Sequence, residues 1–216
     1  MASYIESTGR ASVAEPVGLL TESAVGIAVI ALAIIALAGV SVDVMASIAT
    51  IVIGVGLIVQ GFNSGAEEAK LTQPASANAP DATLGGEAMV HCAGGLTGIV
   101  LGILALVGVN TAHLLAPALI VFGSSLLLGG FISMRPRTMR VASGAMEQQM
   151  VTYQTSPAIS GLEALAGLAA IILGILSVIM TPFGVPVLVG FLAVGAALLV
   201  VSASFAGAAL RLFGTA

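Results

Sequence analysis

The chain has 216 residues, of which 58% are hydrophobic and 7% are charged, and its formal net charge is −4. This composition excludes a water-soluble globule, because such a protein needs far more polar surface, and the few basic residues argue against a nucleic-acid partner. The single cysteine, Cys92, excludes an internal disulfide framework. We therefore expect an all-α protein whose solvent is the lipid bilayer, with no soluble catalytic domain and no enzymatic activity.

The first 15 residues are polar and are predicted to form a cytoplasmic tail, residues 1–15. The apolar run behind them is longer than a signal-peptide core and lacks a cleavage pattern, so we expect it to remain as a membrane span. Pro16 suits the first position of this helix, since its missing N–H would have no partner there. A first hairpin is predicted over residues 16–64, in which Asp43 caps the second span and Gly65 ends it.

Two further hairpins follow, at residues 85–134 and 157–216, and Pro157 marks the start of the third. Residues 65–84, rich in Ala, Pro, Ser and Asn, and the basic segment 135–156 are predicted to be cytoplasmic connections. Each hairpin contains two apolar runs, and about 20 such residues cross a hydrocarbon core of ~30 Å. The predicted spans are 16–40, 44–63, 85–109, a fourth that begins between 113 and 117 and ends at 134, 157–180 and 186–212.

The three hairpins read as copies of one sequence unit. A shift of 69 residues (101 − 32) places Leu32 under Leu101, and a shift of 72 (173 − 101) places Leu101 under Leu173. A repeat of this length indicates helical hairpins, each a pair of membrane spans. The same two shifts align residues in the second span of each hairpin: Gly54, Gly123 and Gly195, and also Leu57, Leu126 and Leu198.

The basic residues all fall on one predicted side of the membrane. The short turns within the hairpins hold Asp43 and His113 and contain no Lys or Arg. Because Lys and Arg concentrate on the cytoplasmic side of membrane proteins, both termini are predicted to be cytoplasmic. The six basic residues are Arg10, Lys70, Arg135, Arg137, Arg140 and Arg211.

The repeat also aligns three ionisable residues near the start of the odd-numbered spans: Glu22, His91 and Glu163. Each lies within two turns of its helix start, ~9 Å along the helix, at the cytoplasmic margin of the hydrocarbon. Together with Glu87, one turn before His91, they are a candidate site for a proton or for a divalent ion such as Zn, Mn or Fe. Alternatively, the helix dipole stabilises the carboxylates, and the side chains satisfy one another without a ligand.

Small residues follow this column on the same face of the odd-numbered spans, and small residues let helix backbones approach closely in lipid. We therefore expect spans one, three and five to meet on a pseudo-threefold axis, with the ionisable column at its cytoplasmic end. The even-numbered spans, richer in bulky residues, would form the outer ring. The predicted packing glycines are Gly26, Gly94, Gly95, Gly98, Gly102, Gly167 and Gly174.

The second hairpin reads LGILAL from Leu101, then a break, IVFG from Ile120 and LLLGGF from Leu126. This pattern resembles the HdeD-type family of short-repeat, six-span bacterial membrane proteins, and the resemblance extends over all three hairpins. It implies a protein of the bacterial inner membrane that is either linked to acid resistance or of uncharacterised function, with no established catalytic residues. The first hairpin lacks the proline that Pro117 and Pro182 supply in the other two.

The function that we predict from these features is association in the membrane. Transporters usually break their helices around a substrate at mid-membrane, whereas these apolar runs are intact. We therefore expect a non-enzymatic accessory, scaffold or self-assembling subunit that contacts the lipid bilayer and forms a homo-oligomer or part of a larger complex, without a cofactor. The alternative is a channel or carrier for protons, metal ions or a small solute, related to acid stress and using Glu22, His91 and Glu163.

Overall fold

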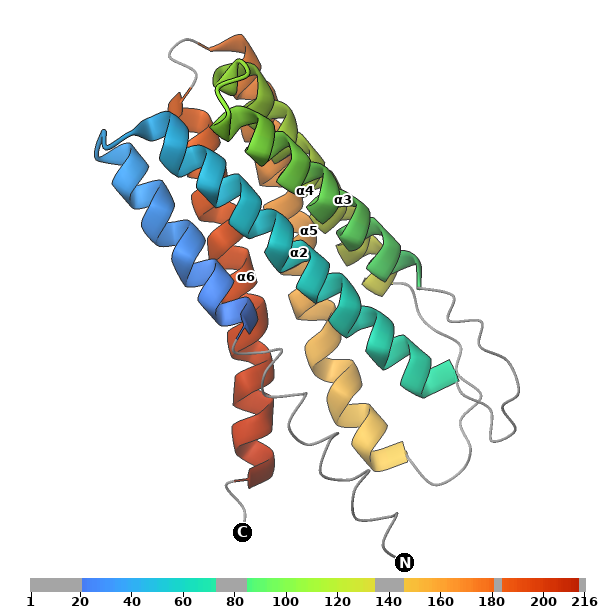
Figure 1. The fold of residues 1–216 in the computed structure, drawn as a ribbon. Coiled ribbons are helices and arrows are strands. Elements are labelled where there is room, and N and C mark those ends of the chain that lie inside the picture. The colour runs from blue at the N-terminus through green and yellow to red at the C-terminus, as the bar shows by residue number, and fades with distance from the viewer. Residues whose placement is uncertain (1–20, 73–84, 135–145, 181–183, 214–216) are drawn as a thin grey trace, which may run out of the picture.

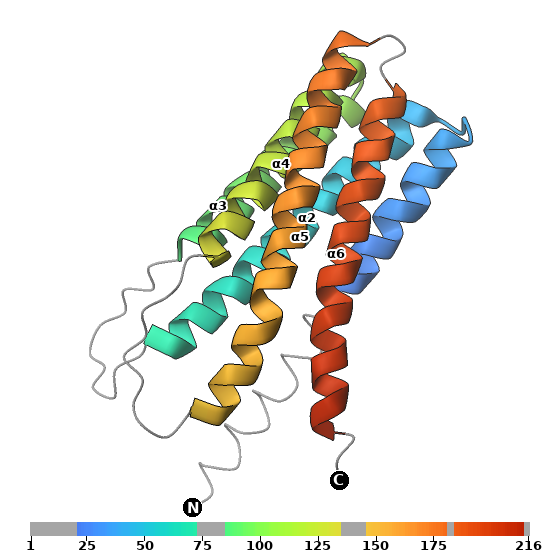
Figure 2. The same ribbon diagram turned by 180° about the vertical axis from the view of Figure 1, so that it is seen from behind.

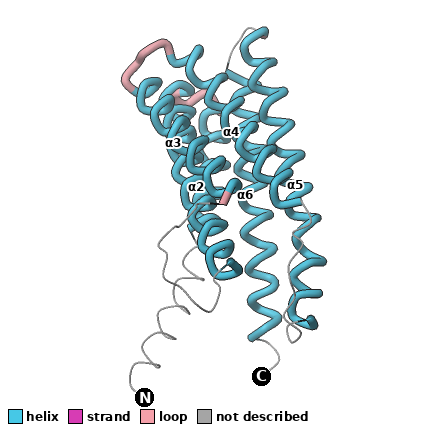
Figure 3. The backbone as a smooth tube through the Cα atoms, turned by 90° about the vertical axis from the view of Figure 1, so that its right-hand side faces the viewer, coloured by secondary structure: helices cyan, strands magenta, loops and turns pink. Residues whose placement is uncertain are grey.

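The computed structural model describes residues 21–72, 85–134, 146–180 and 184–213, and this part of the chain is all-α. Short loops join some of the helices, and the described residues contain no strand (Figure 3). A helical segment, Thr21–Leu37, comes first. The helices that follow are α2 (Val42–Thr72), α3 (Gly86–Leu106), α4 (Thr111–Met134), α5 (Met146–Ile179) and α6 (Gly184–Phe213).

Five of these helices are long and apolar enough to cross a membrane, which confirms the prediction of a multi-pass, all-α membrane protein. The Thr21–Leu37 segment is also apolar, but the start of the predicted first span lies outside the described residues. The apolar stretches are Val42–Gly65, Gly86–Leu106, His113–Ser133, Ser160–Ile179 and Gly184–Ser202.

Successive helices run in alternate directions and pack side by side (Figures 1 and 2). The most extensive contacts join α2 to α3 and α4 to α5, and α3 also packs on α4 and α5 on α6. α2 and α6 finish, and α5 begins, at the same end of the bundle as the start of α3 (Figure 1). This end, at which α3 begins and α4 finishes, is called the long-connection end below.

Two helices extend further than their apolar runs predict. α2 continues to Thr72 and does not end at Gly65, and α5 begins at Met146, so that Pro157 lies inside a helix. The apolar stretches still match the predicted spans at these two places. The reason is that hydrophobicity reports where a helix meets lipid, whereas its hydrogen bonding continues into polar sequence that the same pattern does not mark.

The short turns after the first segment and after α3 have the same conformation. Gly39 and Gly108 have φ of 89° and 88°, a left-handed backbone that glycine adopts at little cost. In the first turn, the N–H of Gly39 bonds to the carbonyl of Ala36 and the N–H of Val40 to that of Ile35, the Schellman pattern that ends a helix. The turn at Gly108 repeats both bonds, from Gly108 to Ala105 and from Val109 to Leu104.

The prediction that the odd-numbered spans form the centre is wrong. Helices α2, α4 and α6 contact one another, whereas the backbones of α3 and α5 do not come into contact in the described chain. In a bilayer, both lipid-facing and centre-facing side chains are apolar, so bulk does not reveal which helix is inside. The large, fully buried apolar side chains come from α2, α4 and α6, apart from Val29 on the first segment: Ile53, Leu57, Leu119, Phe122, Leu126, Leu188, Phe191, Val194 and Leu198.

Glycine pairs bring neighbouring helices into close contact. A Cβ on Gly54 of α2 would lie 2.6 Å from the carbonyl oxygen of Gly95 on α3, so only glycine fits there. Gly123 of α4 and Gly167 of α5 meet in the same way, at 2.6 Å. A third pair joins the first segment to α6, because a Cβ on Gly26 would lie 3.0 Å from the carbonyl oxygen of Gly195 on α6.

The other predicted packing glycines also lie against neighbouring helices. Gly102 and Gly174 face backbone carbonyls of α2 and α4, at Ser47 and Ala116 respectively. Gly94 faces the side chain of Ser125 and Gly98 faces the ring of Phe122, both on α4. The small faces therefore receive the adjacent helices, and they do not line a common axis.

Candidate functional site

The structure brings two of the three aligned ionisable residues into direct contact and buries all three. Glu22 on the first segment, His91 on α3 and Glu163 on α5 are 4%, 0% and 5% exposed. The Nε2 atom of His91 lies 3.3 Å from Oε1 of Glu163. Because the backbones of α3 and α5 do not touch, this side-chain pair bridges the two helices at the long-connection end.

Gln60 on α2 is a member of this site that sequence reasoning missed. Its Nε2 donates a hydrogen bond of 2.8 Å to Oε1 of Glu163, and the side chain is buried. A signal for it exists, since the shift of 69 residues aligns Gln60 with Gly129, which lies against the imidazole of His91. A single amide side chain in an apolar run does not by itself predict a site.

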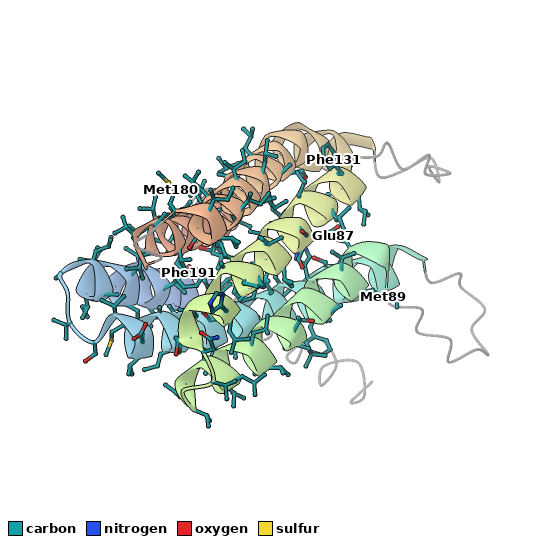
Figure 4. All side chains as sticks on the ribbon, turned by 90° about the horizontal axis from the view of Figure 1, so that it is seen from above. Glu87, Met89, Phe131, Met180 and Phe191 are labelled. Carbon is teal, nitrogen blue, oxygen red and sulfur yellow. The ribbon has the colours of Figure 1, made fainter. Side chains whose placement is uncertain are left out.

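Glu87 and Ser64 extend the site towards the end of the bundle. The hydroxyl of Ser64, on α2, donates a hydrogen bond of 3.2 Å to Oε1 of Glu87, on α3. Glu22 and Glu87 both interact electrostatically with Glu163. Figure 4 labels Glu87 on the side of the bundle from which α3 begins. The polar cluster, as we call it below, consists of Glu22, Gln60, Ser64, Glu87, His91 and Glu163.

Several polar atoms of the cluster have no hydrogen-bond partner within the described part of the chain. Both ring nitrogens of His91 and the Oε1 atom of Gln60 are buried and unpaired. The contact between His91 and Glu163 is thus close, but it lacks hydrogen-bond alignment. Buried polar atoms are nearly always paired with protein, water or an ion, so these three atoms are the ones in the cluster that can form further hydrogen bonds.

The cluster also has an unbalanced charge. It contains three carboxyl groups and one imidazole, and the apolar stretches of the chain contain no Lys or Arg. Placing carboxylates in a low-dielectric interior is costly unless a positive charge compensates them. The basic residues Lys70 of α2 and Arg211 of α6 lie beyond the apolar stretches of their helices.

The geometry does not contain a ready-made metal site. Among the described residues, no three His, Cys, Asp or Glu side chains are placed to hold a metal ion together. The divalent metal predicted for Glu22, His91 and Glu163 therefore stays a prediction. His113 lies exposed near the start of α4, at the opposite end of the bundle from His91.

Beyond the polar cluster, the centre of the bundle is filled with large apolar side chains. Leu119, Phe122 and Phe191 are each fully buried, and Phe191 lies well away from Glu87 (Figure 4). Met89, Phe131 and Met180, labelled in the same view, are on the outside and half or more exposed. The cluster is therefore closed on the side of the short turns by packed apolar groups.

No protein-family model, curated protein or solved structure matches this chain. The resemblance to the HdeD-type family stays a prediction that rests on the repeated apolar sequences.

Proposed function

We propose that this chain is a non-enzymatic membrane protein that works by association, as an accessory, scaffold or self-assembling subunit. The observation that carries the proposal is the filled centre, in which Leu119, Phe122 and Phe191 are fully buried. Passage of a solute requires a polar route or a binding cavity across the membrane. A centre packed with apolar side chains favours a protein that functions through contacts on its outer surface.

Within this proposal, the body consists of three repeated hairpins around a pseudo-threefold axis. Support comes from the glycine pairs, since each joins the second helix of one predicted hairpin to the first helix of the next. The pair of Gly195 and Gly26 joins the third hairpin back to the first, which closes the ring. The matching turns at Gly39 and Gly108 are further support.

The outer surface of this ring offers a broad apolar area to lipid or to another subunit. Large apolar side chains point outward from α3 and α5, whose small faces pack inward. We expect the surroundings to be the inner membrane of a bacterium, with cytoplasmic termini, as the positions of the Lys and Arg residues favour. The outward-facing residues include Leu96, Val100, Ile103, Leu165, Leu168, Ile172 and Ile175.

Purification of the full-length protein from its native membrane in a mild detergent tests this function. We expect the chain to elute as an oligomer or with a partner protein, identified by mass spectrometry. Substitution of Val100→Trp on the outer face should weaken that assembly while leaving thermal stability unchanged. A clean monomer from native membrane that catalyses robust flux in liposomes would refute the proposal.

A second candidate function is a channel or carrier for protons, metal ions or a small solute. The buried, unpaired imidazole of His91 beside Glu163 favours it, because intramembrane ionisable groups often mark ion pathways. The double variant Glu22→Gln, Glu163→Gln should then abolish flux in liposomes while the protein still assembles. Unchanged flux would remove this candidate, and Asp43→Asn, in the first turn of α2, is the matched control.

A further inference from the structure

We propose that the first segment, Thr21–Leu37, is the movable element of this fold, which separates from α6 in the membrane while α3 and α5 stay packed on their neighbours. The motion carries Glu22 out of the polar cluster and uncovers the face of α6 on which the segment packs. The inference rests on the ring of three hairpins proposed above. It concerns motion within one chain, so it does not depend on whether chains associate.

The first argument is that the glycine pair of the first segment is the loosest of the three. A Cβ on Gly95 of α3 would lie 2.5 Å from a backbone carbonyl oxygen of α2, and a Cβ on Gly167 of α5 would lie 2.5 Å from one of α4. The corresponding distance from Gly26 to a carbonyl oxygen of α6 is 3.0 Å. Because close backbone approach is what holds helices together in lipid, the first segment is held least tightly at this position.

The second argument is that glycines on α3 and α5 are replaced on the first segment. Gly102 and Gly174 face backbone carbonyls of the neighbouring helices. The repeat shifts place Ala33 in the same column (102 − 33 = 69; 174 − 102 = 72). The methyl group of Ala33 keeps the first segment further from α6 than a glycine would.

The helix that receives the first segment differs in the same sense. Gly61 of α2 and Gly130 of α4 face backbone carbonyls of α3 and α5, whereas α6 has Ser202 in this column (130 − 61 = 69; 202 − 130 = 72). Helices with fewer close contacts open at lower free energy than the rest of a fold. The first segment is therefore the helix of the ring that we expect to move first.

The turn that joins the first segment to α2 is a suitable pivot. Residues 37–41 are all exposed, and a Cβ on Gly39 would meet nothing within 4 Å. Val25 fills the space beside Gly56 of α2, so the segment can move relative to α6 while it stays in its own hairpin. The turn at Gly108 has the same conformation, so the difference between the first segment and α3 comes from the glycine contacts and not from the turn.

Spin–spin distance measurements in nanodiscs test this inference, with labelled protein diluted by unlabelled protein so that only distances within one chain are recorded. One pair of nitroxide labels, Ile27→Cys with Val185→Cys, spans the contact of the first segment with α6. The control pair, Leu96→Cys with Val44→Cys, occupies the corresponding positions on α3 and α2 (96 − 27 = 69; 185 − 44 = 141). All four native side chains are between 44% and 60% exposed, and both pairs are made in a Cys92→Ser background.

We expect the first pair to show a second population at a distance longer by about 2 Å or more, the range that the spacing of packed helices covers. The control pair should show a single distance. Ala33→Gly should remove most of the longer population, because it restores the glycine that α3 and α5 have in this column. Gly26→Ala should enlarge it, since the new Cβ would collide with Leu199 and approach the backbone of α6.

If Gly26→Ala does not fold, the result for Ala33→Gly decides. Equal distance distributions for the two label pairs, or a longer population that Ala33→Gly leaves unchanged, would overturn the inference. The purification from native membrane described above tests association between chains, and its outcome is independent of this measurement.

Discussion

At the scale of single residues, Gly129 makes room for the imidazole of His91. A Cβ at this position of α4 would collide with the ring, and the packed α4–α5 contact at Gly130 limits any movement of the backbone. His91 is thereby held fully buried, at a place where its ring reaches Glu163. The lack of a side chain at position 129 therefore leaves the space that the imidazole occupies in the polar cluster.

Gly129→Ala should destabilise the fold by roughly 1–3 kcal/mol, the usual cost of inserting a methyl group into a packed interior. The unfolding of the purified protein in detergent measures this cost. Gly86→Ala is the matched control, because a Cβ there would meet only Ile132, at 3.9 Å. Equal stability of the two variants would show that His91 does not occupy the space beside Gly129.

At the scale of secondary-structure elements, the ends of the helices are set by backbone conformation as well as by hydrophobicity. Gly39 and Gly108 both stand at left-handed turns with open space around them. Any effect of a small side chain at these two positions therefore comes from the backbone and not from a clash. The turns join antiparallel helices and so determine how each pair begins to pack.

Gly39→Ala and Gly108→Ala should each cost about 1–2 kcal/mol, because L-residues with a Cβ are disfavoured in the left-handed region. Gly39→Asn should cost less, since asparagine tolerates that conformation better than other non-glycine residues. Thermal unfolding of the three variants checks this order. An alanine variant as stable as the native chain would contradict the left-handed turn.

At the scale of the whole molecule, the first segment and α6 are far apart in sequence but packed together in space (Figure 2). Gly26 contacts Gly195 and Leu199, and the two helices close the bundle. This contact adds to those that α6 makes with α2 and α4. Closure within one chain and exchange of the segment between two chains would bury the same residues.

Gly26→Cys with Leu199→Cys, in a Cys92→Ser background, should give an efficient cross-link with a short thiol reagent. Closure within one chain predicts a cross-linked monomer on a denaturing gel, and the control pair Val100→Cys with Leu199→Cys should not react, because α3 and α6 do not contact each other in the described chain. A cross-linked dimer would instead show that the first segment packs on a neighbouring chain.

Part of the site was predictable because the repeat carries its own alignment. The shifts of 69 and 72 residues brought Glu22, His91 and Glu163 into one column, and all three side chains are buried, two of them in contact. Gln60 was not predictable in the same way, since the corresponding residues on α4 and α6 are Gly129 and Val201, with no shared chemistry. Its role depends on the position of Glu163, which is 103 residues away.

The sequence by itself determined that the chain is helical and belongs in a membrane, because long apolar runs can satisfy their backbone groups in lipid only as helices. It also determined where ionisable residues would be buried. Only the tertiary structure decided which helices form the centre, since apolar side chains are equally at home against lipid and against protein. The centre consists of α2, α4 and α6, whose large side chains fill it, and glycine pairs such as Gly54 and Gly95 let the other helices fit closely around them.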